Sequence, residues 1–229
     1  MKTIGLIGGM SWESTVTYYQ IINRIVKKEL GGLHSARIVL YSVDFAEIEE
    51  YQAKGEWDKS GEVLKEAAIS LEKAGSDVIF LCTNTMHKVA HFIEEAIHIP
   101  FVHIALATAS ILNENKISKV ALLGTAYTME QDFYKEKLIQ EGFEVIIPNK
   151  EERAIIHSVI YNELVKGIIT SSSKEAFLSI IENLHQRGAQ GVILGCTEIG
   201  LLVQQEDTTL PLFDTAIIHA TKAGMMAIE

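Results

Sequence analysis

The stretch AGSDVIFLCTNTM, residues 74–86, is repeated in outline as RGAQGVILGCTEI, residues 187–199. When Gly75 is aligned with Gly188, each stretch runs from a glycine through an apolar segment into a turn that carries Cys and Thr. The alignment pairs Thr83 with Cys196, and it pairs Cys82 with a glycine. Adjacent side chains of an extended segment point to opposite sides. We therefore expect Thr83 and Cys196 to occupy equivalent positions and Cys82 to point into packing.

Two further pairs of similar segments flank this one in the same order along the chain; we call each such internal repeat an echo. TIGLIGGMSWESTVTYY and KVALLGTAYTMEQDFY both run from an apolar strand through a glycine turn into a helix, with Gly124 lying 116 residues after Gly8. IPFVHI and LPLFDT match Pro100 with Pro211. Three ordered echoes indicate two α/β units built to one design.

Short apolar runs alternate with segments of helical period, which is typical of α/β proteins with mostly parallel sheets. The runs predict strands at 3–7, 36–42, 78–81, 101–104, 120–123, 144–147, 191–194 and 212–213. Helices are expected at 13–30, 60–74 and 129–140, each followed by a glycine stop. The expected fold is two pseudo-symmetric domains with the active site in the cleft between them. We place the first domain at 1–104 plus 210–229 and the second at 105–209.

Composition narrows the class of partner. The 229 residues carry a formal net charge of −10, which argues against nucleic acid and anionic membranes as partners. No apolar run reaches the roughly 20 residues that span a bilayer. The N-terminus has no signal-peptide pattern, and two Cys do not make a disulfide framework. These features predict a cytoplasmic protein with two free thiols.

The two Cys- and Thr-containing turns are the candidate reacting centres. In open α/β sheets, ligands bind beyond the carboxyl ends of the strands. Backbone N–H groups at the following helix N-termini predict a carboxylate site, and the same dipole should activate Cys196. Glu198 could instead hold a substrate ammonium. Further donors to a bound carboxylate are expected from Asn84, Thr85 and Thr197.

Two protonatable groups across such a cleft are suited to proton transfer at an α-carbon. One group removes a proton while the other delivers one to the opposite face. Preorganised donors around the carboxylate stabilise the enolate-like transition state. Thr83 and Cys196 are therefore the candidate catalytic pair.

Several motifs along the whole chain resemble the cofactor-independent aspartate/glutamate racemases: MKTIGLIGGMSWEST, KGEWDKSGEVL, CTNTMH, ALLGTAYTM and GCTEIG. The resemblance implies two pseudo-symmetric α/β domains, a homodimer, one catalytic group from each domain and no pyridoxal phosphate. The late family cysteine corresponds to Cys196. The early family cysteine stands immediately before Asn-Thr, a slot that holds Thr83 here. This departure resembles the branch of L-aspartate/glutamate-specific or broad-specificity amino-acid racemases.

The resemblance also implies further contacts for an amino-acid substrate: Met10, Ser11, Gln52, Thr125 and Lys166. Family members place an Arg in the loop at 44–52 to hold a distal carboxylate, but DFAEIEEYQ contains none. Neutral or polar amino acids are therefore plausible substrates beside aspartate and glutamate. A Thr hydroxyl is a poorer base than a thiolate, so we expect one enantiomer to be handled better.

Two other functions remain compatible with the sequence. One is a decarboxylase or cis–trans isomerase of small dicarboxylates, and the other is a non-catalytic protein that closes over an amino acid. No metal site is expected, because His87 and His91 have a zinc-compatible spacing but lack the H-E-x-x-H acid. GLIGGM is not the G-x-G-x-x-G fingerprint of dinucleotide binding.

Overall fold

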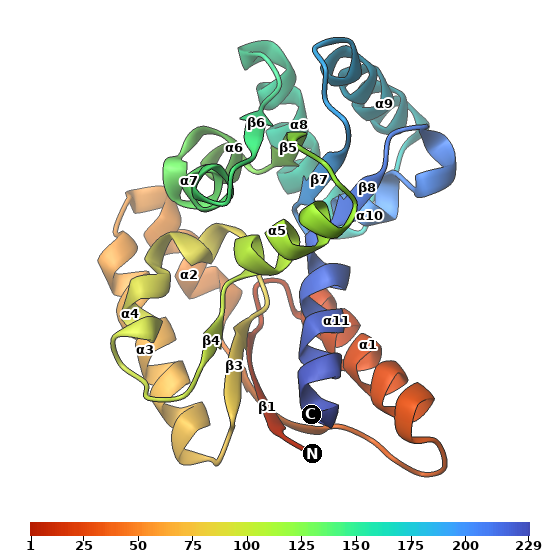
Figure 1. Cartoon of the computed structure of the whole chain (residues 1–229). Helices are drawn as coiled ribbons and strands as arrows, with labels where there is room; N and C mark the ends of the chain where they lie inside the picture. The colour runs from red at the N-terminus through yellow and green to blue at the C-terminus, as the bar shows by residue number, and fades with distance from the viewer. The chain divides into compact units, whose positions relative to one another are not determined.

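A computed structural model describes residues 1–229. The chain divides into two compact units: unit 1 comprises residues 1–107 and 216–229, and unit 2 comprises residues 108–215. Each unit contains one four-stranded parallel sheet flanked by helices (Figure 1). The domain boundaries expected from the sequence are 104/105 and 209/210, whereas the two units of the structure divide at 107/108 and 215/216.

The sheet of unit 1 has the strand order β2-β1-β3-β4. Its strands are β1 (Thr3–Gly8), β2 (Arg37–Ser42), β3 (Val78–Leu81) and β4 (Phe101–Val102). One face is covered by α1 (Trp12–Leu30) and α11 (Thr215–Ile228), whose apolar residues pack on β1 and β3. The other face is covered by α2 (Phe45–Lys54), α3 (Trp57–Lys73), η1 (Thr85–Val89) and α4 (Ala90–Glu94).

The sheet of unit 2 has the equivalent order β6-β5-β7-β8. Its strands are β5 (Lys119–Gly124), β6 (Glu144–Ile146), β7 (Val192–Gly195) and β8 (Leu212–Asp214). Its helical elements are α6 (Ala126–Glu130), α7 (Asp132–Gln140), α8 (Lys150–Asn162), η2 (Leu164–Lys166), α9 (Ser171–Gln186), α10 (Ile199–Leu202) and η3 (Gln205–Asp207). A core cluster from β5, β7, α8, α9 and α10 fills one side of the sheet. The remaining helix, α5 (Ile104–Glu114), contains the boundary between the two units at 107/108.

Strand register confirms the echoes read from the sequence. In unit 1, Gly5 lies opposite Ile79, and in unit 2 Ala121 lies opposite Val192. Ala121 lies 116 residues after Gly5, and Val192 lies 113 residues after Ile79, which are the offsets of the first two echoes. The same offset, continued just beyond the third strand of each sheet, pairs Cys196 with Thr83.

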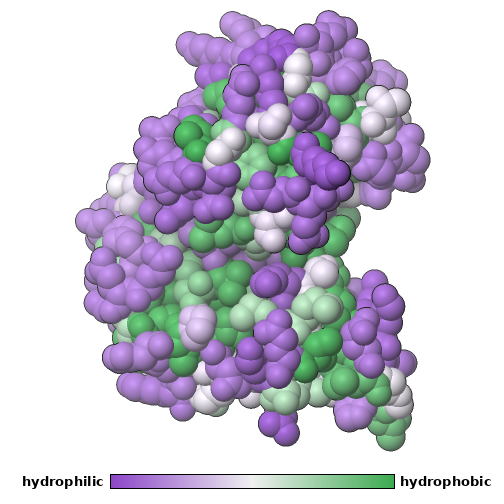
Figure 2. All heavy atoms as spheres, in the orientation of Figure 1, coloured by the Kyte–Doolittle hydropathy of each residue, from purple (hydrophilic) through white to green (hydrophobic).

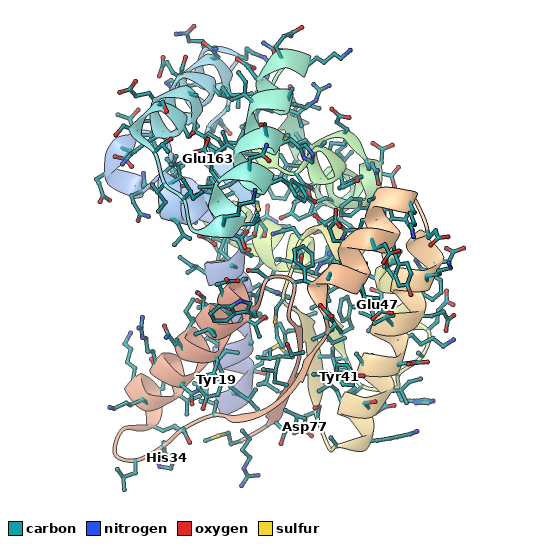
Figure 3. All side chains as sticks on the ribbon, turned by 180° about the vertical axis from the view of Figure 1, so that it is seen from behind. Tyr19, His34, Tyr41, Glu47, Asp77 and Glu163 are labelled. Carbon is teal, nitrogen blue, oxygen red and sulfur yellow. The ribbon has the colours of Figure 1, made fainter.

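The amino-terminal edges of the two sheets repeat each other as well. The Asp77 carboxylate accepts a hydrogen bond from Thr3 N at 2.6 Å, at the end of unit 1 where the chain begins (Figure 3). In unit 2 the Gln190 amide oxygen accepts from Lys119 N at 3.0 Å. Gly75 and Gly188 precede these residues with φ of +87° and +91°. Both glycines therefore adopt the left-handed backbone that a side chain disfavours.

Three expected elements differ from those observed. The strand expected at 101–104 ends at Val102, because the His103 side chain accepts a hydrogen bond from Ala105 N at 3.1 Å and Ile104 opens α5. The helix expected at 129–140 is divided between α6 and α7 at Gln131, whose backbone is extended. The helix expected at 60–74 begins earlier, at Trp57.

Candidate active site

The strand order places the candidate residues of each unit at a topological switch point. In the order β2-β1-β3-β4, the chain adds β2 on one side of β1 and β3 on the other. Crevices at the carboxyl ends of such strands bind ligands in open α/β sheets. The turn after β1 carries Met10 and Ser11, and the turn after β3 carries Thr83. In unit 2 the corresponding turns after β5 and β7 carry Thr125 and Cys196.

The turn after β3 separates the two adjacent candidates for reaction in unit 1. Cys82 is fully buried in the core cluster on the α1 and α11 side of the sheet. Burial raises the pKa of the Cys82 thiol. The prediction that Cys82 points into packing is confirmed. Thr83 retains 8% exposure, and Asn84 and Thr85 beside it are similarly close to full burial.

The other predicted residues of unit 1 lie around the same end of the sheet. Ser11 caps α1 by accepting a hydrogen bond from Ser14 N at 3.3 Å. Met10 is buried in the core cluster on the α2 and α3 side. Gln52 is buried on α2, and its side-chain amide donates to the sulfur of Met86 at 3.0 Å. Met86 follows Thr85 directly, so this bond joins α2 to the turn that carries Thr83. No sequence pattern singled out Met86.

His87 fixes the backbone of the Thr83 turn. Its Nδ1 lies 2.7 Å from the Thr83 carbonyl, which can only accept, so Nδ1 carries the proton. Ile104 N donates to its Nε2 at 3.1 Å. Both ring nitrogens are therefore used, and His87 does not serve as a base for the Thr83 hydroxyl. Burial, followed by the neighbouring His103 and His219, holds the pKa of His87 well below its usual value.

Two further buried histidines surround His87. The ring centroids of His103 and His219 lie 4.4 Å and 6.0 Å from that of His87. His219 donates from Nε2 to the Val102 carbonyl at 2.8 Å and accepts from the Tyr18 hydroxyl at 2.9 Å. Burial lowers the pKa of His219 to about 4. The lowered pKa values keep His87 and His219, behind the Thr83 turn, neutral near pH 7.

In unit 2, strand pairing brings Thr125 and Cys196 to neighbouring turns. Gly124 lies opposite Gly195 in the parallel ladder between β5 and β7, so the residues that follow them leave the sheet side by side. Thr125 caps α6 by accepting a hydrogen bond from Thr128 N at 3.3 Å. Thr125 and Cys196 are both buried.

Cys196 is engaged by the adjacent carboxylate. Its thiol donates to Glu198 Oε2 at 3.1 Å, and the Thr197 hydroxyl donates to the same oxygen at 2.7 Å. Burial is the largest cause that raises the pKa of Cys196 well above its usual value, and the charge of Glu198 adds to it. The expected lowering by a helix N-terminus is therefore wrong. The helix that follows, α10, has only four residues, and its small dipole is outweighed by desolvation and the nearby carboxylate.

Asp214 is a second carboxylate near the thiol that sequence reasoning missed. It ends β8, and its charge also raises the pKa of Cys196. A side chain at Gly200 would place its Cβ 2.4 Å from Asp214 Oδ2, so the glycine permits this close approach. The third echo could have indicated the residue, because it aligns Asp214 with His103 at the end of the fourth strand.

Lys166, the remaining predicted residue of unit 2, lies in η2. It is exposed at the end of η2. The element η2 packs beside α10, the helix that follows the Cys196 turn. The lysine therefore lies on the segment that packs beside this helix.

The structure has no cluster of three or more His, Cys, Asp or Glu side chains suited to a metal ion. Both ring nitrogens of His87 take part in hydrogen bonds, and His91 is exposed. None of the helices combines the length and apolar character that crossing a bilayer requires.

Comparisons with known proteins place this geometry in a family. The sequence model described as Asp/Glu/Hydantoin racemase matches residues 7–223. The broad specificity amino-acid racemase RacX of Bacillus subtilis is 23% identical over 93% of this chain and 92% of its own length.

Two solved structures match the chain over its whole length. A Yersinia pestis protein assigned as an Asp/Glu racemase is 53% identical, with a TM-score of 0.95 and 100% of both chains covered. PH1733, an aspartate racemase homologue from Pyrococcus horikoshii, is 36% identical, with a TM-score of 0.87 and the same coverage. Racemases are isomerases, and by this evidence the chain is an enzyme that belongs to the Asp/Glu/Hydantoin racemase family.

Proposed function

We propose that the protein racemises free amino acids without a cofactor, with Thr83 and Cys196 acting on opposite faces of the α-carbon. The observation that supports the proposal is the strand register, whose offsets, continued just beyond β3 and β7, pair Thr83 with Cys196. A proton donor or acceptor from each of two equivalent turns is what inversion at one carbon requires. Cys82 is excluded from this role by its burial in the core.

The remaining site residues have supporting roles in this proposal. Asn84 and Thr85 supply side-chain hydrogen-bond donors to the substrate carboxylate, where negative charge increases as the α-proton leaves. Thr197 supplies its backbone N–H, because its hydroxyl donates to Glu198. Met10, Ser11, Gln52 and Thr125 form the walls around the substrate. Lys166 contributes positive charge from the segment beside α10, and Glu198 holds the substrate ammonium.

The substrate range extends beyond acidic amino acids in this proposal. The loop at 44–52 carries Glu47, Glu49 and Glu50 and no Arg, so a distal carboxylate finds no bidentate partner there. The name of the Bacillus subtilis relative, a broad specificity racemase, supports the same interpretation. Aspartate and glutamate remain the first substrates to test because of the names of the solved relatives.

The decisive experiment follows the α-proton in deuterated water. L-aspartate, L-glutamate and neutral amino acids are incubated with protein dialysed free of small molecules, and the α-proton signal and optical rotation are recorded. We expect exchange accompanied by loss of optical activity without added cofactor. New carbon products would point to a decarboxylase or cis–trans isomerase. Binding without exchange would identify a non-catalytic binding protein.

We further propose a cytoplasmic homodimer formed through unit 1. The visible face of unit 1 carries more hydrophobic surface than that of unit 2 (Figure 2). On α1 an exposed stripe at helical spacing comprises Trp12, Val16 and Tyr19, the last of which projects from the helix in Figure 3. Leu40 is also exposed on the edge strand β2. Light scattering should give twice the chain mass of 25.4 kDa, and a mass of one chain would contradict the dimer.

A further inference from the structure

Glu198 is hydrogen-bonded to Cys196, a contact that a residue needed only for substrate binding would not require. Its Oε2 accepts hydrogen bonds from both the Cys196 thiol and the Thr197 hydroxyl, at 3.1 Å and 2.7 Å. Cys196 and Glu198 are buried, with exposures of 9% and 8%. The carboxylate therefore interacts with the sulfur at short range in a poorly solvated environment, where Coulomb interactions are strong.

The carboxylate acts on the sulfur in two ways, and both favour the protonated form. It accepts the S–H proton in a hydrogen bond that the thiolate cannot make, and its negative charge repels a second negative charge. Asp214 at the end of β8 adds repulsion from another element of unit 2. A backbone hydrogen bond at Glu198 acts in the opposite direction; its influence is smaller than that of the Glu198 carboxylate and larger than that of Asp214.

We propose that Glu198 keeps Cys196 as a thiol in the free enzyme, and that an ammonium group bound at Glu198 releases the thiolate. The inference rests on the proposed function for its second half, because the amino acid supplies the ammonium. A positive charge against the carboxylate cancels its repulsion of the thiolate and competes for the oxygen that holds the S–H group. The step is one deprotonation: the S–H bond breaks, the electron pair stays on sulfur and the proton leaves to solvent.

This arrangement couples activation of the sulfur to the presence of an amino acid. A carboxylic acid of the same shape that lacks the amine leaves Glu198 charged and Cys196 protonated. The nucleophilic thiolate is then formed mainly when substrate is bound, which protects it from alkylation and oxidation in the free enzyme. Such coupling also discriminates amino acids from the corresponding carboxylic acids.

The test is a spectroscopic titration of the thiolate in the full-length protein. Ultraviolet absorbance of the thiolate is followed against pH, and Cys196→Ser identifies the part of the signal that belongs to Cys196. Glu198→Gln removes the charge while its amide oxygen can still accept both hydrogen bonds. Glu206→Gln removes an exposed carboxylate of the same unit and is the matched control. Circular dichroism confirms that the variants are folded.

Without ligand, we expect the titration midpoint of Cys196 to fall by about one pH unit or more in Glu198→Gln. It should stay in place in Glu206→Gln. Asp214→Asn, which removes the second repelling charge, should lower the midpoint less. A Glu198→Gln midpoint equal to or above that of the unmodified protein would overturn the resting half of the proposal.

The second arm adds L-aspartate, L-glutamate or L-alanine and compares each with the matching acid that lacks the amine, namely succinate, glutarate or propionate. We expect at least one amino acid to lower the midpoint in the unmodified protein, and to lower it less in Glu198→Gln. The matching acid should not lower it. If no amino acid lowers the midpoint, or its deaminated partner lowers it equally, the release step is wrong.

The two proposals fail separately. If the midpoint is lowered in Glu198→Gln but the unmodified protein shows no α-proton exchange, the proposal that Glu198 controls the proton of Cys196 stands and the proposed racemase function falls. Exchange with an unchanged midpoint would retain the racemase and remove the role of Glu198.

Discussion

The turn after β3 and the turn after β7 occupy the same place in two equivalent sheets, yet they are surrounded by opposite chemistry. Thr83 is backed by the buried imidazoles of His87, His103 and His219. Cys196 is bonded to Glu198 and lies near Asp214. A hydroxyl does not titrate near neutral pH, and it is surrounded by groups that hold the backbone. The sulfur can lose its proton, but burial and the nearby carboxylates raise its pKa well above the usual value.

The residue before each reacting position shows the same divergence in packing. In unit 1 it is Cys82, whose side chain fills the core against α1 and α11. In unit 2 it is Gly195, where a Cβ would lie 2.7 Å from the Leu123 carbonyl. The shared backbone therefore tolerates a side chain at this position in one unit and excludes it in the other. The offset of 113 residues in the sequence, and not the residue type, identifies Thr83 as the counterpart of Cys196.

The largest expected effect separates the two thiols. Cys196→Ala should reduce α-proton exchange by about 10³-fold or more, because a general acid–base group contributes on the order of 10²–10⁴-fold. Cys82→Ala, the matched control, should retain exchange, since its sulfur is buried in packing. The measurement is α-proton exchange in deuterated water. A protein that loses exchange through Cys82→Ala while folded would reverse the assignment.

A smaller and directional loss is expected at the other turn. Thr83→Ala should reduce racemisation by about 10²-fold while exchange from one enantiomer continues through Cys196. Thr83→Cys is the complementary variant and should make the rates for the two enantiomers more alike. Comparable turnover of L- and D-substrate by Thr83→Ala would refute the unequal roles of the two faces.

Most of the fold was predictable from the sequence because it depends on local patterns. Buried parallel strands are continuous apolar runs, so all eight expected strands are observed with small differences at their ends. Glycines in the left-handed backbone marked helix ends, as at Gly31 with φ of +70°. Strand 101–104 was predicted too long because the His103 side chain caps α5. The periodicity of hydrophobic residues does not reveal such a contact.

The electrostatics of the candidate site could not be predicted from the sequence. The Cys196 thiol donates to Glu198, and the sign of its pKa shift depends first on burial, then on the charge of Glu198, with a smaller contribution from Asp214 on another strand. The histidine cluster joins residues of η1, the β4–α5 connection and α11, far apart in the chain. The spacing of residues along the sequence does not predict contacts between elements so far apart. Only an alignment of the two units, position by position, could have pointed to them.

The steric difference between the units gives the next prediction. Gly195→Ala should lower the free energy of unfolding by about 2–3 kcal/mol, because the nearest atom to the new methyl group is a backbone carbonyl that cannot move aside easily. Gly31→Ala is the control for backbone strain alone, since no atom lies within 4 Å of its Cβ but its φ is +70°. It should cost about 1 kcal/mol. Urea unfolding followed by circular dichroism compares the two, and equal losses would contradict the steric argument.

The histidine cluster predicts that unit 1 weakens in acid. Burial lowers the pKa of His219 from 6.5 to about 4, so the unfolded chain binds this proton more tightly than the folded unit. The resulting stability is present above pH 6.5 and is lost as pH falls towards 4. Between pH 7 and pH 5 we expect a loss of about 2 kcal/mol from His219, with His87 acting in the same direction.

Trp12 and Trp57 are the two tryptophans of the chain and both lie in unit 1, so tryptophan fluorescence reports its unfolding in urea at the two pH values. His219→Gln removes the titrating group and should reduce the difference between pH 7 and pH 5, whereas His34→Gln, at an exposed position, should leave it unchanged. The unfolding of unit 2 contributes no tryptophan signal. A pH dependence that survives His219→Gln in full would move its origin away from the imidazoles behind Thr83, and would leave the contrast between the two turns resting on the carboxylates of unit 2 alone.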